Sequence, residues 1–285
     1  MRALLGELFK AGRRPAVWVC VLGLLAAVVT IGYALPWLAE TYSPPSSAQG
    51  LPSGTTLADF KVTLYPINFV RQTLQQWAVL GGVFALILGV LLQGSEYGWG
   101  TVKTMYTQRD GRLVMLAGKV GALALVVLVL VLGLFAVAAA SSTAAALLDG
   151  KSLDFPGVAE TIKGIGAMFL IYGFWSLFGL TLATLFRQSA MAIGLGLAYA
   201  LVVEGLIFGF GGGLLGDWVK KIQEWFPIAN TGYLADSFGA IRLRGLPAQA
   251  APYADATHAV AVLATYVAAF LVISALILRR RDVTA

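Results

Sequence analysis

The sequence predicts an all-α integral membrane protein with six transmembrane helices and with both termini in the cytoplasm. Three observations predict this class. Hydrophobic residues make up 59% of the chain and charged residues only 12%, whereas soluble domains contain about 45–50% and about 25%. Six long segments carry either no charge or a single charge, and basic residues gather in every second segment between them.

The uncharged segments have the length of membrane-spanning helices. They cover residues 15–39, 72–95, 120–148, 164–186 and 256–278, and a sixth segment, 188–216, carries only Glu204. A helix needs roughly 20 apolar residues to cross the hydrocarbon core, and uninterrupted apolar runs satisfy their backbone there as helices rather than as barrel strands. We therefore expect spans at residues 16–38, 77–95, 118–143, 164–186, 190–213 and 258–278. The second is placed to start at Trp77 because residues 72–76 are mostly polar.

The distribution of charge predicts the orientation of the spans. With the N-terminus inside, the inner segments hold 12 basic and four acidic residues, and the longer outer segments hold eight basic and nine acidic residues. An excess of lysine and arginine on the cytoplasmic side is the usual pattern of membrane proteins. The net charge of +6 is thus explained by topology, and no soluble basic face for nucleic acid is present.

The segments outside the spans differ in character. Residues 1–14 place apolar side chains on one half of a helical wheel and charged ones on the other, which predicts an amphipathic helix in the membrane interface. The outer segments are residues 40–76, 149–163 and 214–257, and spans four and five are joined inside by only a few residues around Arg187. The alternative for residues 1–14 is an ordinary basic tail.

The sequence lacks the common catalytic and nucleotide-binding motifs. It has no Walker A pattern, no HExxH and no CxxC, so neither an ATP site nor a metal site is expected in this chain. The sole histidine, His258, stands at the outer start of the last span. We expect no catalytic residues, no bound metal and no cofactor, and we expect that the chain by itself is not an enzyme.

Span five contains the residues that we single out inside the membrane. An intramembrane carboxylate such as Glu204 is costly and is a functional-site candidate, either along a polar pathway or as a hydrogen-bond acceptor where the span ends. Phe208 and Phe210 are further candidates for a pathway or gate. Three glycines spaced by four residues could form a helix-packing or dimer face: Gly205, Gly209 and Gly213.

The inner loop between spans two and three, residues 96–112, is longer and more structured than a chain reversal requires. Thr101 can cap a short helix, and the next residues place Val102, Met105 and Tyr106 on one side of it. A methionine and tyrosine face rimmed by charge suits a protein–protein contact. Glu96 and Arg112, at the two ends of the loop, are the residues that we expect to hold it rigid. The alternative is a solvated basic turn that only sets topology.

The loop carries a recognisable motif. Glu96 and Tyr97 are followed by Gly100 and Thr101, then by a hydrophobic residue and a lysine, and later by an arginine and by a lysine at the mouth of the next span. The last four positions are Val102, Lys103, Arg112 and Lys119. This pattern resembles the permeases of type-2 ABC transporters, the membrane subunits of bacterial ABC exporters whose ATPase is a separate chain. The basic N-terminal helix, the six spans, the glutamate in span five and the stretch 225–234 also resemble this family.

The resemblance implies a role for the loop and for the chain. The loop would be a cytoplasmic coupling helix that docks on the ATPase, with Glu96, Tyr97, Gly100, Thr101, Val102, Lys103, Met105, Tyr106 and Arg112 as its residues. The chain would be the permease subunit of an ATP-driven exporter in the bacterial inner membrane, moving an amphipathic or hydrophobic substrate such as an antibiotic, peptide or lipid. Its partners would be two ATPase chains, which bind ATP and Mg, and a second permease chain, identical or homologous.

Two other functions stay open. A non-transporting membrane scaffold or sensor could use the same ATPase contact, and an ATP-independent carrier could do without it. The carrier predicts more polar residues within the spans than Glu204 alone, and it often shows an internal repeat that is absent here.

Overall fold

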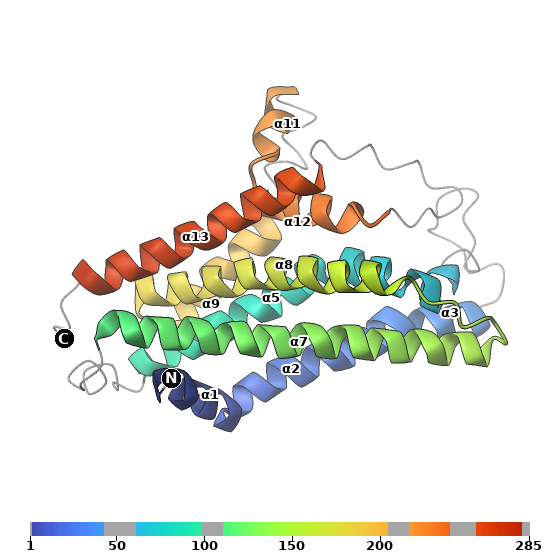
Figure 1. Cartoon of the computed structure of the whole chain (residues 1–285), viewed down its shortest axis with the longest axis horizontal. Coiled ribbons are helices and arrows are strands. Elements are labelled where there is room, and N and C mark those ends of the chain that lie inside the picture. Colours follow the sequence, from blue (N-terminus) through green and yellow to red (C-terminus); the bar gives the residue numbers. More distant parts are fainter. Residues whose placement is uncertain (1, 43–60, 99–110, 205–216, 240–254, 281–285) are drawn as a thin grey trace.

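The computed structural model describes residues 2–42, 61–98, 111–204, 217–239 and 255–280, and every regular element in these ranges is a helix (Figure 1). Five of the helical segments are long and apolar enough to cross a membrane: Pro15–Tyr42, Pro66–Tyr97, Arg112–Leu148, Val158–Phe186 and Ala256–Arg280. The protein is therefore an all-α, multi-pass membrane protein, as the sequence predicts.

The N-terminal part forms a short helix followed by a long one. Helix α1 (Arg2–Arg13) ends just before α2 (Pro15–Ala27), which begins with Pro15 at its first position, where the missing N–H costs nothing. A seven-residue π-helical segment, η1 (Val28–Ala34), continues α2 into α3 (Leu35–Tyr42). The carbonyl of Gly32 in this segment accepts a hydrogen bond from the side chain of Gln72.

Helix α5 (Phe69–Gly98) is longer than the span that hydropathy predicts. It follows two 3₁₀ turns, η3 (Val62–Leu64) and η4 (Pro66–Asn68), and so begins eight residues before Trp77. Its polar first turns are buried and bonded: Gln72 donates to Gly32 O at 2.9 Å, and Thr73 donates to Phe69 O at 2.6 Å. These bonds satisfy the donors of both side chains, and the helix runs through a stretch that is too polar for a hydropathy window.

Two further long helices complete the centre of the molecule. Helix α7 (Arg112–Leu148) has 37 residues and α8 (Val158–Phe186) has 29. Helix α8 ends at Arg187, which has a left-handed backbone conformation (φ 55°), and α9 (Ser189–Ala198) starts two residues later. The short connection predicted between the fourth and fifth expected spans is thus confirmed as a two-residue turn, whereas its location on the cytoplasmic side stays a prediction.

The C-terminal part is less regular. Helix α9 continues into a π-helical segment, η5 (Tyr199–Val203), and residues 205–216 lie outside the described residues. The short helices α11 (Asp217–Gln223) and α12 (Pro227–Asp236) follow, and α13 (Ala256–Arg280) is the last long helix. The expected span 190–213 is therefore described only over its first part, and the sixth crossing stays a prediction.

Glycines bring α5 and α8 into close contact at the core. A Cβ atom added at Gly89 would overlap the carbonyl oxygen of Ser176, and one added at Gly179 would overlap that of Leu86. Gly81 and Gly82 lie likewise against the rings of Tyr172 and Trp175. Small residues let membrane helices approach until their backbones touch, so these glycines fix the central helix pair on which the rest of the molecule packs.

The helix ends gather at two poles of the elongated molecule. Figure 1 shows α1, the start of α7 and the end of α13 at one pole, and α3 with the end of α7 at the other. A hydrogen bond from Arg112 Nη1 to Leu278 O, 3.2 Å long, joins the start of α7 to the end of α13. We call the first the basic pole because it carries Arg13, Arg112, Arg279 and Arg280.

Candidate functional site

The central part of the expected docking loop, residues 99–110, lies outside the described residues. The positions concerned are Gly100, Thr101, Val102, Lys103, Met105 and Tyr106. Both flanks of the loop are described, because Glu96 and Tyr97 end α5 and Arg112 begins α7. The geometry of the site is therefore built from these flanks and from the elements that hold them.

Glu96 lies in a buried cluster of four charges, which we call the inner ion cluster: Glu7, Lys10, Glu96 and Lys119. Lys119 Nζ is 2.5 Å from Glu96 Oε1 and 3.5 Å from Glu7 Oε2. Lys10 Nζ is 2.7 Å from Glu7 Oε1 and 3.2 Å from Glu96 Oε1. Each cation contacts both carboxylates, so the cluster is balanced in charge, as buried charges require.

The inner ion cluster joins three helices that are far apart in sequence. Glu7 and Lys10 come from α1, Glu96 comes from the last turn of α5, and Lys119 lies two turns into α7. Glu7, Glu96 and Lys119 are each at most 5% exposed. Helices α5 and α7, which flank residues 99–110, are thus joined by a buried ion pair between Glu96 and Lys119. Helix α1 contacts both residues of this pair through Glu7 and Lys10.

Helix α1 reaches this position because its polar face turns toward the protein. The backbone of Ala3 packs against Gly118 of α7, where an added Cβ would lie 2.9 Å from Ala3 Cβ. On the other side of α1, Leu5 and Phe9 are more than half exposed, and apolar side chains in that position suit the acyl region of a membrane interface. The charged side of the amphipathic helix α1 therefore contacts α5 and α7 through Glu7 and Lys10.

The contacts within the cluster set the charge state of Lys10. Burial lowers the pKa of the Lys10 ammonium, but the carboxylates of Glu7 and Glu96 outweigh this effect, and the pKa lies above its ordinary value. Lys10 is consequently charged at every physiological pH. Lys10 therefore contributes a positive charge to the contact between α1 and α5.

The other two flanking residues occupy different surroundings. Tyr97 Oη accepts a hydrogen bond of 3.3 Å from Gln93 Nε2, one turn earlier on α5. Arg112 donates to the carbonyl of Leu278 on α13. Each of the two ends of the loop is thus held by the membrane domain, Glu96 through the inner ion cluster and Arg112 through the last helix. The contact between Glu96 and Lys119 was not foreseen; Lys119 was noted only as part of the motif.

Glu204 caps the N-terminus of helix α12. Its carboxylate accepts hydrogen bonds from the backbone N–H of Ile228 at 3.0 Å and of Ala229 at 3.3 Å, and Tyr199 Oη also donates to it. Ile228 and Ala229 are in the first turn of α12, whose first residue is Pro227. A carboxylate at a helix N-terminus satisfies free N–H groups and interacts favourably with the helix dipole. Of the two interpretations of Glu204, this geometry favours the structural one.

The remaining candidates of span five cannot be located. Phe208, Phe210, Gly205, Gly209 and Gly213 all lie outside the described residues, so their assignment to a pathway, gate or packing face stays a prediction. Aromatic residues do surround the described part of this segment. Tyr199 contacts Phe178 with ring centroids 5.4 Å apart, and Phe178 stacks on Phe270 of α13 at 5.3 Å.

A second ionic cluster lies at the opposite pole. Lys61 Nζ is 2.6 Å from Glu40 Oε2 and 3.0 Å from Asp149 Oδ1, and Trp37 and Tyr65 both donate hydrogen bonds to Asp149. Burial would raise the pKa of the Asp149 carboxyl, but Lys61, Tyr65 and Trp37 outweigh it and hold the pKa below its ordinary value. This cluster fastens α3 and the turn before α5 to the end of α7.

The comparison with protein families gives a match that covers most of the chain. The family model described as "Protein of unknown function (DUF2705)" matches residues 62–284. The chain belongs to this family. A search of curated proteins finds no match to the chain. The matched region of the DUF2705 chain contains Glu96, Lys119 and Glu204, whereas α1 with Glu7 and Lys10 precedes it.

The described contacts at these sites are ionic and hydrogen-bonding contacts between helices. Within the described part of the DUF2705 chain, no group of three histidine, cysteine, aspartate or glutamate residues could hold a metal ion. The inner ion cluster and the Glu204 cap both use charge to fix the position of one helix against another. The inner ion cluster joins α5 and α7 close to the ends that flank residues 99–110.

Proposed function

We propose that the chain is the membrane-spanning permease subunit of an ATP-driven ABC exporter. The observation that carries this proposal is the inner ion cluster, which binds both flanks of the loop 96–112 to α1 in a buried, charge-balanced contact. A loop that only reverses the chain has no need of such an anchorage. A loop that receives a push from an ATPase subunit needs stiff connections to the helices that it moves.

The topology of the proposal has six spans and both termini in the cytoplasm of a bacterial cell, with the protein in the inner membrane. Five membrane-length helices and the apolar helix Ser189–Ala198 are compatible with it. The basic pole, which bears the loop flanks, then faces the cytoplasm, as the positive-inside rule favours. The pole with the Asp149 cluster faces outward.

The partners in this proposal are two ATPase chains and a second permease chain, identical or homologous. The ATPase supplies the bound ATP and Mg, since this sequence has no nucleotide-binding motif. The substrate is an amphipathic or hydrophobic compound of the antibiotic, peptide or lipid class, moved outward by alternating access. A balanced ionic clamp on α5 and α7 favours coupled motion of these helices over independent fluctuation.

The test compares two single substitutions on the expected coupling helix. Met105→Asp changes the side that we expect to enter the ATPase, and Thr104→Asp adds the same charge on the opposite side of the helical wheel. We expect Met105→Asp to abolish co-purification of the ATPase and Thr104→Asp to retain it, with both variants inserted at equal levels in the membrane. Equal co-purification of both variants would refute the docking role.

A scaffold or sensor that contacts the same ATPase is separated from an exporter by transport itself. In proteoliposomes that contain the purified complex, an exporter accumulates substrate with ATP hydrolysis. A complex that hydrolyses ATP in response to ligand yet moves no substrate would identify the sensor.

A further inference from the structure

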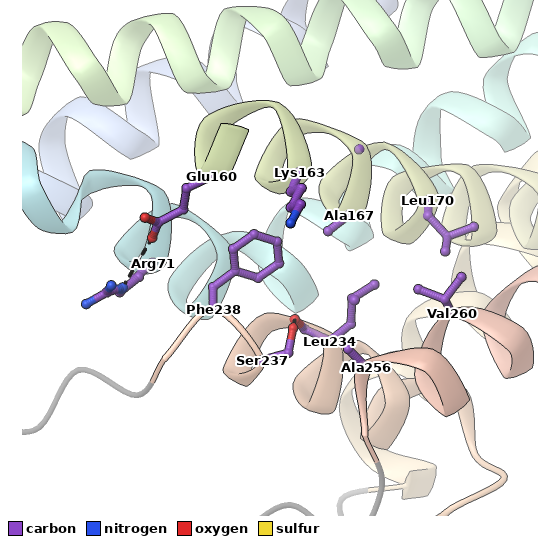
Figure 2. Close-up of a pocket in the computed structure, with 11 residues that line it drawn as sticks. Arg71, Glu160, Lys163, Ala167, Leu170, Leu234, Ser237, Phe238, Ala256 and Val260 are labelled. Atoms are coloured by element: carbon purple, nitrogen blue, oxygen red, sulfur yellow. Dashed lines mark hydrogen bonds and ion pairs between the residues drawn. The ribbon is translucent and has the colours of Figure 1, made fainter. Parts of the chain in front are cut away.

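A pocket of about 690 Å³ lies between the starts of α5, α8 and α13 and the end of α12 (Figure 2). Its volume is in the range of small-molecule sites, about 300–1,000 Å³. Part of its wall is apolar. Helix α8 contributes Ala167 and Leu170, α12 contributes Leu234, α13 contributes Val260, and Phe238 lies just after the end of α12. The pocket is distant from the inner ion cluster and takes no part in the function proposed above.

The charged groups of the pocket are arranged unevenly. Arg71 Nε is 3.4 Å from Glu160 Oε1, so these two charges neutralise one another at one end. Lys163 lies on α8 one turn beyond Glu160, is exposed, and points into the space opposite Phe238 (Figure 2). The Lys163 ammonium makes no ion pair with another described residue, and Asp236, on the last turn of α12, accepts a hydrogen bond of 3.5 Å from Gln75. Among the described residues that line the pocket, Lys163 is therefore the one charge without an opposite partner, and it lies beside an apolar wall.

The location of the pocket indicates the source of its ligand. Helices α8 and α13 are both candidate membrane spans, and Lys163 stands in the first turns of α8, where a membrane protein meets the lipid head groups. Lysine near the end of a span extends its ammonium toward that layer. From Lys163 the apolar wall continues along α8 through Ala167 and Leu170 and along α13 through Val260, in the direction of the hydrocarbon.

We propose that this pocket binds an anionic membrane phospholipid, with the phosphate head group on Lys163 and an acyl chain against Ala167, Leu170 and Val260. A ligand with a single negative charge matches the uncompensated ammonium, and a hydrocarbon chain matches the wall. A zwitterionic phospholipid carries a cation in its head group beside the phosphate, so its electrostatic attraction to Lys163 is weaker. This proposal stands whether or not the chain belongs to an exporter.

The charge requirement is tested by lipid binding to the full chain in neutral detergent. Native mass spectrometry compares phosphatidylglycerol with phosphatidylcholine of the same acyl chains, and inorganic phosphate serves as a probe without a chain. Lys163→Gln removes the ammonium, and Lys151→Gln removes an equally exposed lysine outside the pocket. We expect phosphatidylglycerol to bind more tightly than phosphatidylcholine, and Lys163→Gln to weaken it about fivefold, the effect of one cation near a membrane surface, with Lys151→Gln unchanged.

The pocket itself is tested by filling it. Gly166 lines the pocket, and a Cβ added there meets no atom within 4 Å, so Gly166→Leu places its side chain in the pocket from a position with room for its first carbon. Gly173, also on α8, has the same clearance for an added Cβ but lies outside the pocket, and Gly173→Leu is the control. We expect only Gly166→Leu to reduce binding of phosphatidylglycerol.

Three results would overturn the proposal. Equal affinity for the two phospholipids would remove the charge requirement, and unchanged binding in both Lys163→Gln and Gly166→Leu would place the lipid elsewhere. Binding of inorganic phosphate as tight as that of phosphatidylglycerol would identify a site for a free anion instead.

Discussion

Lys119 is the residue on which the inner ion cluster depends most. Lys119 is only 4% exposed, and its ammonium contacts both Glu7 and Glu96. In its absence two carboxylates would share the single cation Lys10, and a buried charge without a partner costs far more than the intact pair contributes.

We predict that Lys119→Gln destabilises the protein by about 3–5 kcal/mol, the usual cost of breaking a buried ion pair. Thermal unfolding in detergent, followed by tryptophan fluorescence, measures the change, and Lys151→Gln is the exposed control. The double variant Glu96→Gln/Lys119→Gln should lose less than the sum of the two single variants, because it removes one of the unpaired carboxylates. Strictly additive losses would show that Glu96 and Lys119 do not interact.

For Glu204 the prediction concerns hydrogen exchange, because its partners are backbone amides. Replacement by alanine removes the acceptor for the N–H groups of Ile228 and Ala229. Hydrogen bonds to a charged group contribute about 1.5–3 kcal/mol, so these amides should exchange hydrogen about 10- to 100-fold faster in Glu204→Ala. Glu204→Gln keeps one acceptor oxygen and should give an intermediate rate. Protection that is unaltered in Glu204→Ala would mean that α12 starts without this cap.

The sequence could identify individual charged residues but not their partners. Glu96 and Lys119 were recognised through their motif, and Glu204 was singled out because an acid inside a span is rare. The pairing of Lys119 with Glu7 spans 112 residues, and no periodicity encodes such a contact. The polar side of residues 1–14 suits water as well as it suits a buried ionic partner, so the wheel alone could not decide between them.

At the scale of the element, the glycine contacts of α5 and α8 determine how closely the central helices pack. We predict that Gly89→Ala destabilises the protein by about 1–3 kcal/mol, the cost of overpacking, because its Cβ would meet the backbone carbonyl of Ser176, which cannot rotate away. Gly173→Ala adds the same methyl group to open space on α8 and should be neutral or slightly stabilising.

The unfolding temperatures of Gly89→Ala and Gly173→Ala in the same detergent measure this difference in stability. A similar Tm for Gly89→Ala and Gly173→Ala would contradict the close approach of the two backbones.

The beginning of α5 illustrates what hydropathy can predict about an element and what it cannot. Apolar length predicts that a helix is present, and a helix covers each of the five predicted spans that lie wholly within the described residues. The predicted span begins at Trp77 because residues 72–76 are mostly polar. In the structure these residues are helical, and Gln72 donates to the carbonyl of Gly32 in the π-helical segment η1, a contact that hydropathy does not encode.

At the scale of the whole molecule, two ionic clusters lie at opposite poles of a bundle whose centre is apolar. One ties α1, α5 and α7 together beside residues 99–110, and the other ties α3 and the turn before α5 to the end of α7. Helix α7 is thus held by an ionic cluster near each of its ends.

The most direct measurement for this account is affinity purification of the chain from its native membrane, with the partners identified and the mass of the intact complex determined. We predict a complex of two permease chains and two ATPase chains that hydrolyses ATP, and we predict that Glu96→Gln retains the ATPase but uncouples hydrolysis from transport. Recovery of the chain with no nucleotide-hydrolysing partner would contradict the proposed function.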